Sequence, residues 1–82
     1  MFAYVLVTVS SGSERDFVRR IAECSEVVEA SVVIGENDVV LKIQVDNMEH
    51  MDKFLTDKLR VIPDVFLTTT MVITKQFKPR PQ

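Results

Sequence analysis

The chain has 82 residues, which is the size of one small domain. Ten Lys and Arg residues against twelve Asp and Glu residues give a formal net charge of −2, which argues against a protein that binds nucleic acid through a basic surface. Cys24 is the single cysteine and His50 the single histidine, so an internal disulfide is excluded and a stapling metal site is not expected. Oligomerisation is then the remaining way for so small a core to add buried surface.

The start of the chain predicts a strand followed by a helix. The β-branched and aromatic run from Phe2 to Ser10 predicts a strand that ends at a Ser-Gly-Ser turn. Ser13 with Asp16 three residues later approximates a capping box, and apolar residues then recur at helical spacing. We therefore expect an amphipathic helix from Glu14 to Ser25.

The remainder predicts a hairpin, a second helix and a last strand. Strands are expected over 27–34 and 39–45, joined by the turn Gly35-Glu36-Asn37-Asp38. A helix begins at Asp46-Asn47 and is stopped by Pro63, because the residue before a proline is pushed out of helical geometry. The threonine- and valine-rich stretch over 65–74 is expected to form the fourth strand.

This β-α-β-β-α-β order predicts an α+β, ferredoxin-like fold with a four-stranded antiparallel sheet and both helices on one face. Right-handed crossovers place the first and third strands side by side in the centre. We expect one domain over residues 1–75 and a short, solvated C-terminal tail over 76–82. No signal peptide and no apolar run of membrane-spanning length is visible, so a soluble cytoplasmic protein is expected.

Strand alternation divides the sheet residues into two sets, one for each face. The set expected to meet the helices is Ala3, Val5, Val7, Val9, Val39, Leu41, Ile43, Val45, Val65, Leu67, Met71 and Ile73. The other set is Tyr4, Leu6, Thr8, Val40, Lys42, Gln44, Phe66, Thr68, Thr70 and Val72. Its apolar members would form a patch larger than a monomer usually exposes. We therefore expect a homodimer, sheet against sheet, with the interface residues Tyr4, Leu6, Val40, Phe66 and Val72; a monomer with scattered apolar surface residues is the alternative.

Two local motifs allow a structural and a functional interpretation. In the structural interpretation, the residues from Gly35 to Asp38 form a hairpin turn because Gly, Asn and Asp supply positive φ. In the functional interpretation, a ligand approaches the glycine backbone and Asp38 pairs with the ammonium group of that ligand. Thr68 and Thr70 are good strand residues, and they also point the same way and offer hydroxyls to a carboxylate. His50 is interpreted as a surface or helix-packing residue, because no triad partner is placed by sequence. No phosphate loop, metal-ligand cluster or nucleophile motif is present, so no catalytic residue, metal or cofactor is expected.

Several stretches in order resemble the effector-binding domain of the Lrp/AsnC regulators, also called the RAM domain. They cover nearly the whole chain and are Ala3–Val7, Gly35–Lys42, the helix start with Asp46, Met48 and Glu49, Ile62–Val65 and Val65–Val72. The resemblance implies a dimer with barrel-like packing of two sheets, dimers arranged in a ring that is typically an octamer, and amino acids bound between dimers.

Carried onto this sequence, the resemblance implies an effector site formed by Gly35, Asn37, Asp38, Val39, Thr68 and Thr70. Asn37 departs from the family, which often has an aromatic or apolar residue before the aspartate, and this favours a polar ligand. The family's helix-turn-helix has no counterpart in this sequence, which resembles a stand-alone form. Direct DNA binding is therefore not expected, and the chain would sense amino acids alone or co-assemble with full-length regulators.

Two other function classes remain as alternatives. Dimeric ferredoxin-like domains also serve as small monooxygenase-type enzymes, which need a polar cavity between sheet and helices. The helix-facing set is almost wholly aliphatic, which disfavours that class. A ligand-free assembly domain is the third hypothesis, and insensitivity of the oligomer to amino acids would favour it.

Overall fold

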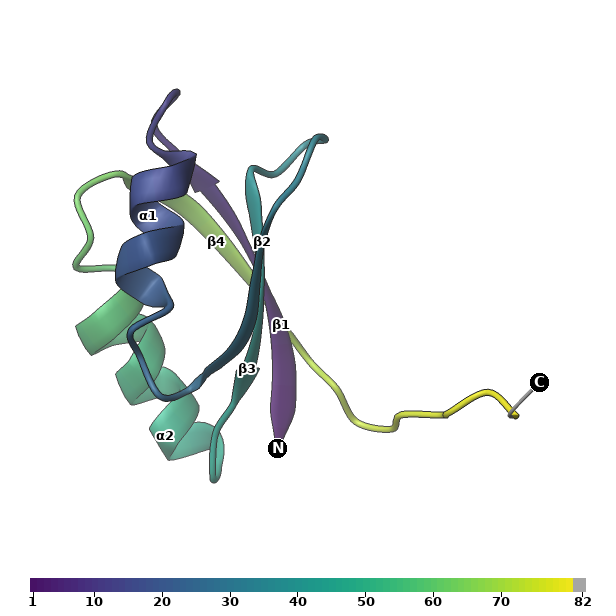
Figure 1. The fold of residues 1–82 in the computed structure, drawn as a ribbon. Coiled ribbons are helices and arrows are strands. Elements are labelled where there is room, and N and C mark those ends of the chain that lie inside the picture. The colour runs from purple at the N-terminus through teal and green to yellow at the C-terminus, as the bar shows by residue number, and fades with distance from the viewer. Residues whose placement is uncertain (81–82) are drawn as a thin grey trace.

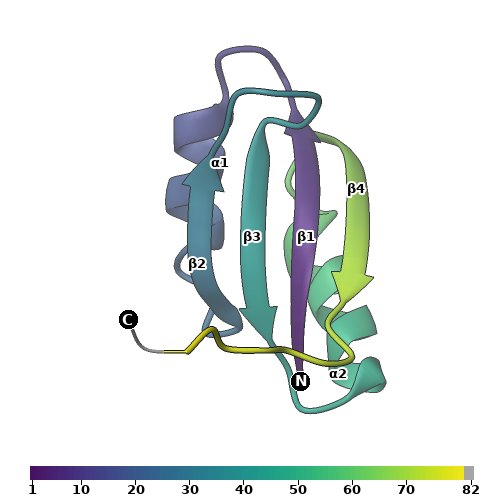
Figure 2. The ribbon, with the colours of Figure 1, turned by 90° about the vertical axis from the view of Figure 1, so that its right-hand side faces the viewer.

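A four-stranded antiparallel sheet forms one layer of the molecule and the helices form the other (Figure 1). The computed structural model describes residues 1–80. The strands are β1 (Phe2–Val9), β2 (Val27–Val32), β3 (Val39–Gln44) and β4 (Val65–Val72), and the helical elements are α1 (Glu14–Ile21), α2 (Met48–Lys53) and η1 (Phe54–Leu59). The strand order is β2-β3-β1-β4, so the first and third strands are central, as predicted (Figure 2). The predicted fold is confirmed.

The first helix is shorter than predicted, because it ends at Ile21 and not at Ser25. Cys24 N–H donates to the carbonyl of Ile21, three residues back, so the chain tightens and leaves α-helical geometry there. The predicted capping box is wrong, since the Ser13 side chain makes no capping hydrogen bond. A carboxylate oxygen of Glu14 accepts the Gly12 N–H instead, at 3.4 Å.

The second helix begins with a true cap and changes its winding halfway. The side chain of Asn47 accepts the His50 N–H at 2.8 Å, which satisfies one of the unpaired donors at the helix start. α2 then continues directly into the π-helical segment η1, and Arg60 N–H donates to the carbonyl of Leu55, five residues back. The predicted single helix is therefore two consecutive segments, and the second ends at Leu59, before the predicted stop at Pro63.

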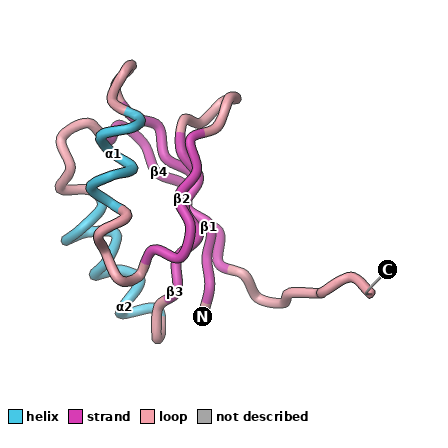
Figure 3. Tube along the Cα trace, in the orientation of Figure 1, coloured by secondary structure: helices cyan, strands magenta, loops and turns pink. Residues whose placement is uncertain are grey.

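The helices and the sheet form two layers (Figure 3), and the hydrophobic core lies between these layers. Every second residue of β1 is buried, and the same holds for β3, so the predicted helix-facing residues of these strands are confirmed. The fully buried side chains with the largest volumes are Phe17, Phe54, Ile21, Leu41, Ile43, Met51 and Leu59. Each comes from α1, β3 or the α2–η1 helical segment. Burial of these apolar side chains between the helical layer and the sheet is therefore the main driving force of the fold.

The predicted faces of β4 are inverted beyond its first residue. Val72, Thr70 and Thr68 lie directly opposite Ala3, Val5 and Val7 of β1, and opposite residues share a face. These β4 residues therefore face the helices, whereas they were expected on the outer face. The cause is a bulge: Thr8 pairs with Leu67 and Val9 with Val65, so Phe66 is an extra residue and the alternation slips by one.

The outer face of the sheet, defined as the face turned away from the helices, keeps its apolar character after this correction. Val72 leaves the predicted interface, because it packs against the core. Met71 and Leu67 take its place on this face, because the strand register sets them opposite Tyr4 and Thr8. Leu67 is 62% and Met71 47% exposed, and Phe66 in the bulge is 73% exposed. The face thus presents large apolar side chains to solvent.

Candidate functional site

The turn between β2 and β3 ends at Asp38, whose backbone and side chain are both engaged. Its N–H donates to the carbonyl of Val7 at 3.0 Å, and its own carbonyl accepts the Val33 N–H at 2.9 Å. One carboxylate oxygen, Oδ2, accepts the Val9 N–H at 3.0 Å. Asp38 therefore fixes the end of β1 to the hairpin, and within residues 1–80 no protein donor reaches its second carboxylate oxygen.

Gly35 and Asn37 of this turn do not have the positive φ that their residue types predicted. Among residues 1–80, only Gly12 has a positive φ, at 87°, so the expectation that Gly35 or Asn37 supplies one is wrong. A Cβ placed on Gly35 would meet no atom within 4 Å, so the backbone there is open to its surroundings. Asn37 is half-buried, and its side-chain oxygen accepts a long hydrogen bond of 3.5 Å from the Thr8 hydroxyl.

Val39 follows Asp38 and supports it from the core. Its side chain is 0% exposed, and its backbone pairs with Val7 on one side and Val32 on the other. Any contribution of Val39 to a ligand site therefore consists of positioning Asp38, since its side chain is unavailable.

Thr68 and Thr70 point to one side, as expected, but this side faces the helices, and both are half-buried. Val39, Val7 and Thr68 form one row across three strands. Two strand spacings separate the ends of this row, which places the Asp38 turn and Thr68 about 10 Å apart in backbone position. Strand β1 lies between them, and residues 1–80 enclose no pocket of their own. Within one chain the turn and the threonines do not converge on a single ligand.

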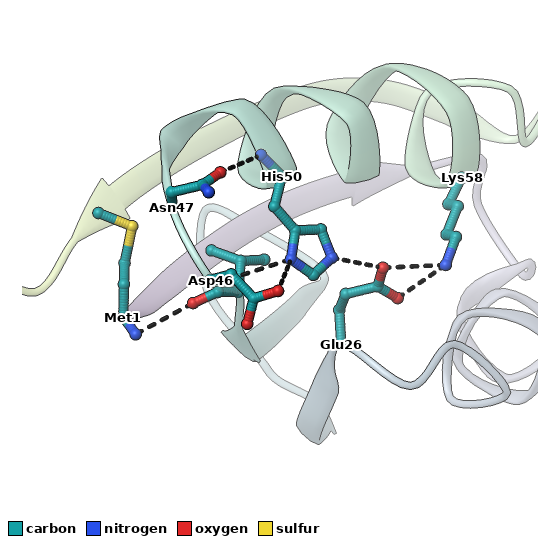
Figure 4. A network of polar contacts seen from close by, with 7 residues as sticks. Met1, Glu26, Asp46, Asn47, His50 and Lys58 are labelled. Carbon is teal, nitrogen blue, oxygen red and sulfur yellow. Dashed lines mark hydrogen bonds and ion pairs between the residues drawn. The ribbon is translucent and has the colours of Figure 1, made fainter.

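A polar network that was not predicted lies between β2 and the second helix (Figure 4). Glu26, immediately before β2, is only 6% exposed. Its carboxylate contacts His50 Nε2 at 3.0 Å and accepts two hydrogen bonds from Lys58 Nζ, each at 2.9 Å. On the other side of the imidazole, Asp46 N–H donates to Nδ1 at 3.1 Å. Nδ1 is thus an acceptor, so Nε2 carries the proton and donates to Glu26.

The electrostatics of this network favour a charged Glu26. Burial alone would raise the pKa of its carboxyl, but the hydrogen bonds from His50 and Lys58 outweigh burial and lower the pKa to about 2. The hydrogen bond to Glu26 in turn raises the pKa of Lys58. The network therefore ties β2 to the helical segment through a buried carboxylate, and every buried side-chain polar atom of residues 1–80 has a partner.

These two regions differ in what they can bind. In the Glu26 network the donors and acceptors are already paired with one another. No group of three His, Cys, Asp or Glu side chains within residues 1–80 is arranged to hold a metal ion. The Asp38 turn, in contrast, combines an anionic side chain with an open backbone at an exposed loop.

The comparison with known proteins agrees with this architecture. The family model described as the Lrp/AsnC ligand binding domain matches residues 2–82. The chain belongs to the Lrp/AsnC family. The resemblance found in the sequence is thereby confirmed over the whole domain.

Lrp/AsnC relatives include a transcriptional regulator and solved structures. The HTH-type transcriptional regulator FL11 of Pyrococcus horikoshii is 36% identical over 78 residues, which are 95% of this chain and 51% of FL11. The chain thus spans about half the length of the curated relatives it matches. The hypothetical protein PHS023 of Pyrococcus horikoshii is 35% identical with a TM-score of 0.84, and the match covers 90% of each chain.

A third Lrp/AsnC likeness concerns the fold alone. The transcriptional regulator NMB0573 of Neisseria meningitidis, solved as a complex with L-Met, is 21% identical with a TM-score of 0.86. The match covers 95% of this chain and 52% of that one. Separately, none of the helices within residues 1–80 has the length and apolar character needed to cross a membrane.

Proposed function

We propose that this chain is a non-enzymatic amino-acid sensor of the Lrp/AsnC family that works as an oligomer in the cytoplasm. It would regulate transcription indirectly, alone or by co-assembly with full-length regulators. The observation that carries this proposal is the match of residues 2–82 to the family's ligand-binding domain. The L-Met complex of a regulator with the same fold supports an amino acid as the ligand class.

The oligomer begins with a homodimer that covers the outer face of the sheet. Tyr4, Leu6 and Val40 lie on this face with Leu67 and Met71. Covering ~600 Å² of apolar surface per chain would contribute about 15 kcal/mol of gross free energy at ~25 cal/mol per Å². That is comparable to the whole stability of a small domain, which is about 5–15 kcal/mol. A second copy of the chain is the simplest partner that would cover this face and contribute that free energy. A ring of dimers such as an octamer would follow from further contacts.

The ligand site lies between copies, because β1 separates the two candidate groups within one chain. In this arrangement the ligand ammonium pairs with the free carboxylate oxygen of Asp38, a charge-assisted contact. Thr68 and Thr70 of a neighbouring chain would receive the ligand carboxylate through their hydroxyls. A zwitterion is small, with about 3.5 Å between its nitrogen and its farther carboxylate oxygen, so both halves of the site must approach closely.

Calorimetry with each of the twenty amino acids tests this proposal. Asp38→Asn removes the charge but keeps an oxygen that can accept the Val9 N–H, so the fold is preserved while the ammonium loses its partner. We expect at least one amino acid to bind the wild type, and Asp38→Asn to weaken that binding at least ten-fold.

Glu36→Gln is the matched control, because it removes one negative charge from the same exposed turn. We expect this variant to bind like the wild type. Binding of no amino acid at all, or equal losses in the two variants, would contradict the proposed role of Asp38.

A further inference from the structure

The C-terminal tail, residues 75–80, leaves the domain on the side away from the helices (Figure 1). Figure 2 looks onto the outer face of the sheet and shows the tail crossing the lower ends of the strands, from the β4 edge toward the β2 edge. The last backbone hydrogen bond that ties this end to the sheet joins Ile73 N–H to the carbonyl of Phe2, at 2.9 Å. The backbone of residues 75–80 makes no hydrogen bond to the backbone of residues 1–74. The tail therefore projects on the side from which a second copy would approach the outer face.

The composition of the tail differs from that of the body. Lys75, Lys78 and Arg80 carry three positive charges with no acidic residue among them. Removing these three from the chain total leaves seven basic and twelve acidic residues, a formal charge of −5, on residues 1–74. A basic strand attached to an acidic domain is attracted to the surface of another such domain. Glu29, exposed on β2 and opposite Lys42, offers an acid on the outer face itself.

Phe77 gives the tail an apolar anchor. Its side chain is 79% exposed, and the Lys75 ammonium lies 5.1 Å from its ring centroid. Large aromatic side chains contribute much of the free energy at interfaces when they fill a site on the partner. Pro79 restricts the backbone, which lowers the conformational entropy lost on docking. The family match also extends through this segment to residue 82, so the tail belongs to the matched domain and is not an unrelated extension.

We infer that the tail is a strap that docks on the second copy of the chain, with Phe77 as its anchor and its basic residues against the acidic body of the partner. The inference rests on the sheet-to-sheet dimer proposed above. In a symmetric dimer each chain gives one strap and receives one. Both straps then add to the contact made by the outer face.

The contribution of the strap to dimerisation is tested by measuring the dimer dissociation constant with sedimentation equilibrium. The proteins compared are the wild type, a chain ended after Thr74, Phe77→Ala and the neighbouring Gln76→Ala as control. We expect the first two variants to raise the dimer Kd at least ten-fold and Gln76→Ala to change it less than two-fold. Phe77→Ala keeps the inference testable if the shortened chain does not fold.

A second measurement separates docking on the partner from folding back on the same chain. At a concentration ten-fold below the dimer Kd, where the protein is monomeric, we expect the wild type and Phe77→Ala to have equal melting temperatures. A lower melting temperature of monomeric Phe77→Ala would assign the tail to its own chain and overturn the strap. An unchanged Kd in every variant would also overturn it while leaving the sheet-to-sheet dimer intact. A wild type that stays monomeric would overturn both proposals.

Discussion

At the scale of single residues, Glu26 is the one charged side chain of residues 1–80 that the fold buries. Lowering its pKa from 4.5 to about 2 corresponds to about 3 kcal/mol of stability. Because the folded-state pKa lies below the ordinary value, this contribution is complete above about pH 5 and is lost as the pH falls toward 2. We therefore expect the free energy of unfolding to decrease through this window.

The variant Glu26→Gln isolates this contribution. At pH 7 we expect it to lower the free energy of unfolding by about 3 kcal/mol, because Lys58 loses its anionic partner. The difference from the wild type should shrink toward zero near pH 2, as measured by urea unfolding over a pH series. Glu23→Gln, which alters an exposed carboxylate, should stay within about 0.5 kcal/mol of the wild type throughout. A difference that does not depend on pH would contradict the assigned ionisation.

At the scale of elements, the cap of α2 is a separable contribution. Asn47→Ala removes the oxygen that accepts the His50 N–H, so we expect a loss of about 1 kcal/mol in urea unfolding at pH 7. Asn47→Asp keeps an acceptor and places a negative charge at the positive end of the helix, so it should be neutral or slightly stabilising. Equal losses in both variants would show that the amide nitrogen, and not the capping oxygen, is what matters.

The strands differ in how well the sequence alone predicts their buried faces. Alternation predicted the buried faces of β1 and β3 because both strands are regular where they pair with each other. It failed on β4 because the bulge at Phe66 has no signature in a run of β-branched and aromatic residues, and one extra residue inverts every position after it. The Glu26 network was out of reach for a different reason. Its partners His50 and Lys58 lie 24 and 32 residues away, so only the packed fold brings them together.

At the scale of the whole molecule, the sequence predicts for the candidate site too which residues take part but not how far apart the fold places them. The residues of the Gly35–Asp38 turn could be named from their types and from the family resemblance. Their distance from Thr68 could not, because it depends on β1 being inserted between β3 and β4. Because β1 separates the Asp38 turn from Thr68 by two strand spacings, the proposed ligand site needs groups from two copies of the chain. The outer face is the surface through which we propose that copies associate, so the proposed function depends on it.

Two apolar residues of equal exposure on different sides of the molecule test this dependence. Leu67 is 62% exposed on the outer face, and Val61 is 61% exposed in the connection that follows η1. A glutamate at Leu67 would place a charge inside the proposed interface, where desolvation is costly, so we expect Leu67→Glu to give the mass of one chain by light scattering. Val61→Glu adds the same charge outside that face and should keep the oligomeric mass of the wild type. Both variants should retain the circular dichroism of the native fold, since neither side chain is part of the core. A Leu67→Glu protein that assembles as the wild type does would show that the sheet face is not what holds the copies together.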